Sequence, residues 1–196
     1  MIKEIVLASA SKRRSQILAS CGIKHKIFTS NAREVHFQNR TPVWNVKENA
    51  RRKARICAKK YRNNVIIAAD TLVVLKGQLI GKPKNEIEAK KLFKAFSGNR
   101  LEVVSGICVM DTQTGKNACA TEHSLLYAQE LYNKDLDRYF DALKPYDKAG
   151  GFSIEGIGSF IYDDIKGSYF NILGLPMILL KNLFKKISLD VLDFCN

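Results

Sequence analysis

One acidic residue, Asp70, interrupts the most apolar stretch of the sequence. The apolar residues 65–69 precede it, and residues 72–75 continue the apolar run after Thr71. A carboxylate in such surroundings is predicted to be buried, and a buried charge is costly unless it is paired, metal-bound or used as a proton acceptor. Two interpretations stay open on this pattern: a catalytic carboxylate, and a structural aspartate that caps a turn at Thr71.

A second group with chemical potential is the basic turn SASKRR at residues 9–14. It lies between a short apolar run and a helix-like pattern. Cations in the first turn of a helix oppose the positive end of the helix dipole unless an anion lies among them. Free backbone N–H groups, two hydroxyls and two guanidinium groups suit a triphosphate, and a solvated basic turn is the alternative.

Four further residues are candidates from their positions. Lys82 follows a predicted hairpin that folds the chain back towards the buried carboxylate, although a surface lysine would fit the same pattern. Glu34 follows a small polar segment and is a candidate metal ligand. Glu155, in the glycine-rich residues 147–156, can accept hydrogen bonds from a base edge, although a pair of tight turns suits that segment equally. Lys53 lies on a basic helix where nothing local distinguishes it.

The elements that must position these residues follow from hydrophobic periodicity. Alternating and short apolar runs predict strands at residues 5–8, 65–69, 72–75, 78–80, 101–110 and 118–128. Helical spacing predicts helices that begin near residues 11, 46, 85, 133 and 176. Turns at residues 76–77 and 111–115 create antiparallel hairpins, which exclude a simple doubly wound sheet. The sequence therefore predicts one mixed α/β domain over residues 1–196.

Composition limits the class of protein. The chain has 196 residues, of which 46% are hydrophobic and 26% charged, which excludes disordered and fibrous classes. Its 32 Lys and Arg against 19 Asp and Glu give a net charge of +13, which favours an anionic partner: nucleic acid, a membrane surface or a phosphorylated small molecule. No apolar run is long enough to span a membrane.

The five cysteines are scattered and form no CxxC pair, so we expect reduced thiols in a cytoplasmic protein. The three histidines lack metal-ligand spacing. Any metal is therefore expected to be a hard cation that carboxylates and phosphate oxygens hold.

Together the motifs resemble those of the Maf family of nucleotide pyrophosphatases. The matching segments, in order, are residues 7–14, 69–71, 81–83, 97–98, 147–150, 167–169 and 174–176. The resemblance implies an elongated mixed β-sheet with flanking helices in two lobes, related to inosine-triphosphate pyrophosphatases, with the active site in the cleft. It also implies hydrolysis of a nucleoside triphosphate to a monophosphate and pyrophosphate with a divalent metal cation, Mg²⁺ or Mn²⁺.

The same resemblance implies roles for individual residues. Asp70 matches the catalytic proton acceptor, and with Glu34 it matches the acidic positions near the metal. The positions that match substrate-binding residues are Ser9, Arg14, Lys53 and Lys82 for the phosphates, and Arg13, Thr71 and Glu155 for the base.

Two positions depart from the family pattern. Lys12 stands where the family usually has proline. Arg13 and Thr71 agree with the dTTP/UTP branch, whereas Glu155 agrees with the 7-methyl-GTP branch. A carboxylate only accepts hydrogen bonds, so Glu155 suits the N–H groups of guanine, while a glutamine would suit a pyrimidine. We expect a dTTP/UTP-like or broad specificity, with a 7-methyl-GTP pyrophosphatase as the alternative.

Two other functions remain as hypotheses. The net charge and the basic helix over residues 47–60 are compatible with nucleic-acid binding, although few aromatic residues and no nucleic-acid-binding signature accompany them. A nucleotide-responsive regulator of cell division is the other, as the family's older name, septum formation inhibitor, suggests. An apolar face on the last predicted helix is compatible with a homodimer.

Overall fold

The computed structural model describes residues 3–29, 34–35, 37, 39–143 and 153–195. The chain divides into two compact units. The first comprises Met1–Asp70, Ser105–Glu122 and Gly174–Asn196, and the second comprises Thr71–Val104 and His123–Leu173. The glycine-rich segment 147–152, which the sequence analysis singled out, lies outside the described residues.

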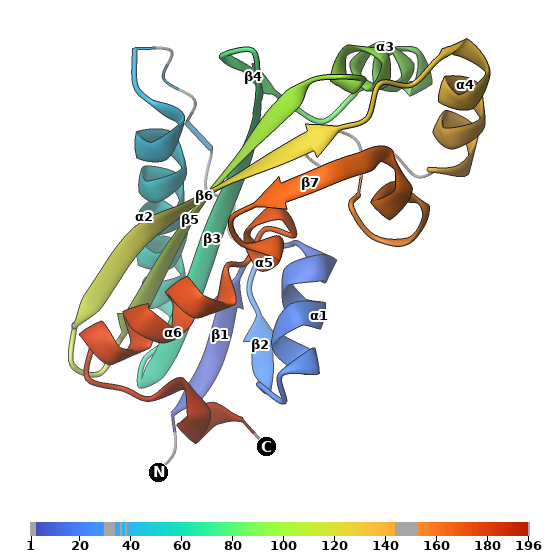
Figure 1. Ribbon diagram of the computed structural model, residues 1–196. Coiled ribbons are helices and arrows are strands. Elements are labelled where there is room, and N and C mark those ends of the chain that lie inside the picture. The colour runs from blue at the N-terminus through green and yellow to red at the C-terminus, as the bar shows by residue number, and fades with distance from the viewer. Residues whose placement is uncertain (1–2, 30–33, 36, 38, 144–152, 196) are drawn as a thin grey trace. The chain divides into compact units, whose positions relative to one another are not determined.

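The strands of the described chain form one mixed sheet (Figure 1). They are β1 (Glu4–Ala8), β2 (His25–Ile27), β3 (Asn64–Leu75), β4 (Gln78–Ile80), β5 (Arg100–Asp111), β6 (Asn117–Ala128) and β7 (Tyr162–Lys166). Their order is β2-β1-β3-β5-β6-β7, and β4 pairs with β3. Because β1 is parallel to β2 and β3 while β3–β4 and β6–β7 are antiparallel, the expectation of a mixed sheet is confirmed.

Helices flank the sheet, as expected. They are α1 (Lys12–Ser20), α2 (Pro42–Lys60), α3 (Glu86–Phe96), α4 (Asn133–Ala142), α5 (Tyr169–Ile172) and α6 (Met177–Lys186), with 3₁₀ turns η1 (Gly156–Ile161) and η2 (Val191–Phe194). In the first unit, α2 lies behind the sheet, and α1 and α6 lie in front of it (Figure 1). None of the helices among the described residues has the length and apolar character needed to cross a bilayer.

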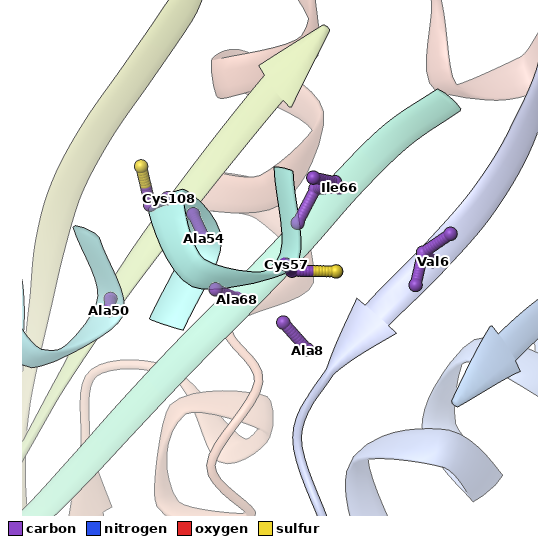
Figure 2. Close-up of a cluster of buried hydrophobic side chains, with 8 residues drawn as sticks. All are labelled: Val6, Ala8, Ala50, Ala54, Cys57, Ile66, Ala68 and Cys108. Atoms are coloured by element: carbon purple, nitrogen blue, oxygen red, sulfur yellow. The ribbon is translucent and has the colours of Figure 1, made fainter. Parts of the chain in front are cut away.

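The core of the first unit explains how α2 is held. Strand residues two apart point to the same face of the sheet, and helix residues three or four apart lie on the same side of the helix. One face of the sheet therefore packs against one side of α2. Small side chains fill that interface (Figure 2). Its fully buried members are Val6 and Ala8 of β1, Ile66 and Ala68 of β3, Cys108 of β5, and Ala50, Ala54 and Cys57 of α2.

Gly106 of β5 sets the distance between α2 and the sheet. A Cβ atom at this position would lie 2.5 Å from the backbone carbonyl carbon and oxygen of Val46. Real Cβ contacts are not that short, so only glycine allows the helix backbone to lie directly on the strand. The close approach matters because short side chains of α2 can then reach the sheet.

Cysteine pairing differs from the expectation of reduced thiols. Cys108 and Cys119 lie opposite one another on β5 and β6, with Cα atoms 4.1 Å apart, and form a disulfide. The expectation is therefore wrong for these two residues, because the hairpin brings together cysteines that are eleven positions apart. Cys21, Cys57 and Cys195 are free thiols, and burial raises the pKa of Cys57 to about 12.

The second unit contains the predicted β3–β4 hairpin. Lys76 and Gly77 both have positive φ, 51° and 79°, as a two-residue hairpin turn requires. Asn85 caps α3 by accepting a hydrogen bond from the Glu88 N–H at 2.9 Å, as its spacing predicted. These local signals were sufficient to place the elements around Lys82.

Candidate active site

Asp70 lies within β3, just beyond the point where the parallel pairing of β3 with β1 ends. Ala8, the last residue of β1, is in register with Ala68 of β3, so Ser9 follows the end of β1 while β3 continues through Asp70 to Leu75. The alternation of β3 continues from Ile66 through Ala68 to Asp70, which turns the carboxylate towards α2. Asp70 is 4% exposed, so the predicted buried carboxylate is confirmed.

Lys53 of α2 joins two carboxylates. Its Nζ atom donates to Asp70 Oδ1 at 2.7 Å and to Glu34 Oε1 at 2.7 Å, and it lies 3.4 Å from the carbonyl oxygen of Ala69. The Lys53 and Asp70 side chains are buried, whereas Glu34 is half-exposed. An ammonium group has three protons, and here three oxygen atoms lie around it.

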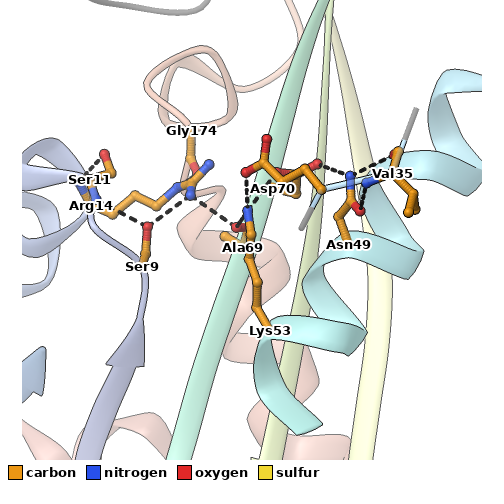
Figure 3. A network of polar contacts seen from close by, with 10 residues as sticks. Ser9, Ser11, Arg14, Val35, Asn49, Lys53, Ala69, Asp70 and Gly174 are labelled. Atoms are coloured by element: carbon orange, nitrogen blue, oxygen red, sulfur yellow. Dashed lines mark hydrogen bonds and ion pairs between the residues drawn. The ribbon is translucent and has the colours of Figure 1, made fainter. Parts of the chain in front are cut away.

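Two asparagines precede Lys53 along α2 (Figure 3 shows the second). Asn45 accepts a hydrogen bond from the Phe37 N–H at 3.1 Å and donates to the Phe37 carbonyl at 3.2 Å. Asn49 holds Val35 in the same way, at 2.9 and 3.1 Å, and its Nδ2 also donates to Asp70 Oδ2 at 2.9 Å. Helix residues spaced by four therefore hold the backbone of the segment that carries Glu34.

Arg14 of α1 connects three parts of the first unit (Figure 3). Its Nε donates to the carbonyl of Gly174 at 2.9 Å, and its Nη1 donates to Ser9 Oγ at 3.0 Å and to the carbonyl of Ala69 at 2.9 Å. Ser11 caps the helix by accepting from the backbone N–H of Arg14. The basic turn is thus an ordered structure, because the guanidinium is bonded to Ser9, directly after β1, and to the carbonyl of Ala69 within β3.

Burial of Arg14 has an electrostatic consequence. Removal from water lowers the pKa of the Arg14 guanidinium, and the nearby carboxylates of Asp70 and Glu34 partly oppose that effect. Arg14 and Lys53 contribute two positive charges, and the two carboxylates contribute two negative charges. The cluster is close to neutral overall, which allows four ionisable groups to occupy one partly buried region.

The structure brings five of the sequence-predicted residues into one connected network in the first unit: Ser9, Arg14, Glu34, Lys53 and Asp70. Arg13 lies half-buried on α1 in the same unit. The other three, Thr71, Lys82 and Glu155, belong to the second unit.

Within the second unit these three residues differ in their surroundings. Thr71 is half-buried in β3 directly after Asp70, and Lys82 is exposed between β4 and α3. Glu155 is exposed just before η1, where its Oε2 accepts a hydrogen bond from Ser153 Oγ at 3.3 Å. Their roles in substrate binding stay predictions.

Asn45 and Asn49 were not among the residues predicted from the sequence. Both are almost completely buried, at 0% and 1% exposure. A usable signal was present, because Asn45, Asn49 and Lys53 are spaced by four and share a side of the helix with the small residues Ala50 and Ala54. Buried polar side chains at helical spacing must find hydrogen-bond partners, so their pattern predicts a packed polar segment.

The fold and the network define a mixed α/β protein with a buried ionic site where the parallel pairing of β1 and β3 ends. The family model described as Maf-like protein matches residues 4–187. The chain belongs to the Maf family, so the predicted resemblance is confirmed.

Curated relatives match over nearly the full chain. A "dTTP/UTP pyrophosphatase" of Dictyoglomus thermophilum is 37% identical over 193 residues, which cover 98% of this chain and 100% of the relative. A protein with the same description from Methanosarcina barkeri is 32% identical over 193 residues, with 98% of each chain covered. Among solved structures, the Ham1 protein of Staphylococcus aureus is 17% identical, with a TM-score of 0.47 over 65% of this chain and 73% of its own.

Proposed function

We propose that the protein hydrolyses nucleoside triphosphates to a nucleoside monophosphate and pyrophosphate, with dTTP and UTP as the preferred substrates. The observation that carries the proposal is Asp70: a buried carboxylate within β3, just beyond the end of its parallel pairing with β1, with Lys53 bonded to it and Arg14 close by. The full-length similarity to relatives described as dTTP/UTP pyrophosphatases supports the same reaction.

In this reaction Asp70 acts as the proton acceptor. The oxygen of a water molecule forms a bond to the α-phosphorus, and its proton passes to the Asp70 carboxylate. The bond between the α-phosphorus and the bridging oxygen breaks, and pyrophosphate leaves with that oxygen. Transfer of this kind depends on positioning and charge neutralisation. Fixed cations beside the base therefore matter more than a covalent nucleophile.

Ser9, Arg14, Lys53 and Lys82 bind the phosphates in this proposal. Arg14 supplies a cation that three hydrogen bonds already orient, so little side-chain entropy is lost when an anion arrives. Lys53 is bonded to Glu34 and Asp70 without substrate. The positive charge of Lys53 attracts the phosphates through space, or its ammonium group exchanges one of these two carboxylates for a phosphate oxygen.

A divalent cation, Mg²⁺ or Mn²⁺, fits the acidic residues of this site. Glu34 and Asp70 both have an oxygen within 2.7 Å of the same ammonium group, so two hard oxygen ligands lie in one place. Among the described residues, no three histidine, cysteine or acidic side chains are grouped so that they could hold a metal ion by themselves. Such a cation, held by Glu34 and Asp70 with substrate oxygens, would neutralise charge that develops on the phosphates.

The decisive experiment is a pyrophosphate-release assay with dTTP, UTP, CTP and 7-methyl-GTP in the presence of Mg²⁺ or Mn²⁺. Asp70→Asn keeps the shape of the side chain but removes the proton acceptor, so we expect activity to fall at least about 100-fold. Asp163→Asn, at an exposed position on β7, is the matched control and retains activity. Full activity in Asp70→Asn, or no release from any triphosphate, contradicts the proposal.

The base preference rests on Arg13, Thr71 and Glu155. In the same assay, Glu155→Gln is expected to shift the ratio of kcat/KM values towards the pyrimidine triphosphates, because an amide both donates and accepts hydrogen bonds. An unchanged ratio would remove Glu155 from base recognition. A wild type that prefers 7-methyl-GTP would instead support the alternative specificity. The homodimer and the cytoplasmic location stay predictions.

A further inference from the structure

The amide of Asn49 uses all of its hydrogen-bonding groups except one oxygen lone pair. Its oxygen accepts from the Val35 N–H, and its nitrogen donates both protons, one to the Val35 carbonyl and one to Asp70 Oδ2. The nitrogen faces two acceptors and the oxygen faces a donor, so the chemistry fixes which atom is which. Reversing the amide would place its oxygen against a carboxylate and a carbonyl.

Asn49 complements Lys53 on the same carboxylate. Lys53 Nζ bonds to Asp70 Oδ1, and Asn49 Nδ2 bonds to Asp70 Oδ2 (Figure 3). Rotation of a carboxylate about its last bond is otherwise only weakly restricted. The two donors are four residues apart on the same face of α2 and bond to different oxygens, which fixes that rotation.

The packing of α2 makes this contact feasible. An asparagine side chain is short, and it reaches Asp70 because Gly106, Ala50 and Ala68 let the helix lie close to the sheet. The position of Asp70 thus depends on a helix that begins 28 residues before it in the sequence, at Pro42. The same helix also fixes Val35, the neighbour of Glu34.

We infer that Asn49 is a positioning residue for the proposed reaction, which orients the Asp70 carboxylate and couples it to the segment that carries Glu34. The inference rests on the proposed function for its catalytic consequence. Its structural part, a hydrogen bond from a neutral amide to Asp70, stands independently.

Asn45 provides a matched control within the same helix. It holds the backbone of Phe37 with the same pair of hydrogen bonds and is equally buried, but among the described residues its side-chain hydrogen bonds go to Phe37 and not to Asp70. A substitution at Asn45 therefore removes a similar clamp without removing the contact that joins Asn49 to Asp70. Differences between the two positions report on that contact.

The first experiment needs no substrate. Nuclear magnetic resonance at one neutral pH compares the side-chain amide signals of both asparagines in the wild type and in Asp70→Ala. We expect the Asn49 amide signals to shift, because one amide proton loses its acceptor, and the Asn45 amide signals to shift by a much smaller amount. Asn49 amide signals that stay unchanged in folded Asp70→Ala overturn the inference, whether or not the protein is an enzyme.

The second experiment compares Asn49→Asp with Asn45→Asp. Asn49→Asp replaces the donor to Asp70 Oδ2 with a carboxyl group that repels the Asp70 carboxylate. We expect kcat to fall at least about tenfold, with KM within about twofold of wild type, because Asp70 loses its fixed orientation. Asn45→Asp should reduce kcat much less.

Asn49→Leu separates orientation from charge. It removes the donor to Asp70 without adding a carboxyl group, so we expect kcat to fall roughly tenfold. Asn45→Leu loses the equivalent clamp and should reduce kcat much less. Equal effects at both positions, in folded proteins with similar thermal unfolding, would show that Asn49 acts only by holding the segment and would overturn the inference.

The two proposals fail in different ways. If the wild type releases no pyrophosphate from any triphosphate, the proposed function fails, while the comparison of amide signals still decides whether Asn49 bonds to Asp70. If the wild type is active and the kcat values of the two sets of asparagine variants coincide, the proposed function stands and the positioning role of Asn49 fails.

Discussion

The ion pair between Lys53 and Asp70 is buried, and a buried ion pair is tolerated only while both of its charged partners are present. Both side chains are buried, and Arg14 adds a further buried cation close by. Burying such charges costs more than a surface ion pair returns, and removing one partner leaves an uncompensated charge. Three buried charges around Asp70 are therefore better explained by a role in catalysis than by a contribution to the stability of the fold.

Asp111 is a contrasting buried carboxylate whose contacts are purely structural. It lies at the end of β5, where it accepts hydrogen bonds from Lys3 Nζ at 2.6 Å, Thr114 Oγ1 at 2.8 Å and the Gln113 N–H at 3.0 Å. Burial acts to raise the pKa of Asp111, but these hydrogen bonds outweigh it and hold the pKa below its ordinary value of 3.8. The ionised side chain thus ties the N-terminal segment to the β5–β6 turn.

Asp111→Asn should lower the free energy of unfolding by about 1–3 kcal/mol at pH 7, because the charge-assisted hydrogen bond from Lys3 is lost. A depressed pKa stabilises the fold above the pKa of the unfolded state, and this contribution is lost as pH falls through the folded-state value. The difference between wild type and variant should therefore shrink as pH falls below about 3.8. Urea unfolding at pH 7, 5, 4 and 3 measures it, with Asp163→Asn as the exposed control.

At the residue scale, the sequence identified Asp70 but not Asn49. Asp70 was recognisable because its apolar neighbours in the sequence predict that its carboxylate is buried. The partners of Asp70 were harder to identify. Asn49 and Lys53 lie 21 and 17 positions away and meet the carboxylate only because of how the helix packs on the sheet. Periodicity within a segment does not specify which strand the segment will face.

At the element scale, the sequence predicted most helices and strands but misplaced some details. It missed β2, a three-residue strand at the edge of the sheet, because so short a segment has no clear alternation. It started α2 four residues late, although Thr41 as N-cap and Pro42 at the first helical position are the usual signals of a helix start. The polar pair at Asp70 and Thr71 interrupts the apolar run, yet β3 continues through it.

The helix α2 is the element on which the site depends most. It contributes Asn49 and Lys53, and it holds the segment that carries Glu34. Its height above the sheet is limited by Gly106, where the strand and helix backbones touch. Adding one methyl group at this glycine should therefore reduce both the stability of the fold and the catalytic rate.

Gly106→Ala tests this dependence. The added Cβ would lie 2.5 Å from the Val46 backbone, so α2 must move outward, and overpacking of this kind costs about 1–3 kcal/mol. Because Asn49 and Lys53 move with the helix, we expect kcat to fall roughly tenfold as well. Thermal unfolding and the pyrophosphate-release assay measure the two effects.

Gly77→Ala is the control for a glycine replaced without a steric clash. Its φ of +79° makes alanine unfavourable, but no atom lies within 4 Å of the added methyl group. We expect a loss of about 1 kcal/mol in stability with little change in kcat. If Gly106→Ala retained full activity while losing stability, the close packing of α2 would matter to the fold but not to the site.

At the scale of the whole molecule, the net charge of +13 gives less information than the placement of individual charges. Arg14 and Lys53 are buried in the network, where they neutralise carboxylates. On α2, the exposed positions include Arg55, Lys59 and Lys60, which need no ligand to be stable in water. The total charge attracts anions of any kind, whereas the buried cations have defined neighbours.

The division into two units raises the question of whether they unfold separately. The strands β3, β5 and β6 each contribute residues to both units, so neither unit has a complete set of strands of its own. Loss of one unit would leave three strands half-paired, with backbone donors and acceptors that have lost their partners. We therefore predict one cooperative unfolding transition, as expected for the single domain over residues 1–196.

The only tryptophan of the chain makes this prediction measurable. Trp44 lies on α2 in the first unit, so its fluorescence reports on that unit, whereas far-ultraviolet circular dichroism reports on the helices and strands of both. In urea the two signals should change with the same midpoint and the same slope, because cooperative unfolding leaves no populated intermediate. A phase in circular dichroism without a matching change in Trp44 fluorescence would mean that the second unit unfolds independently and that the shared strands do not couple the two.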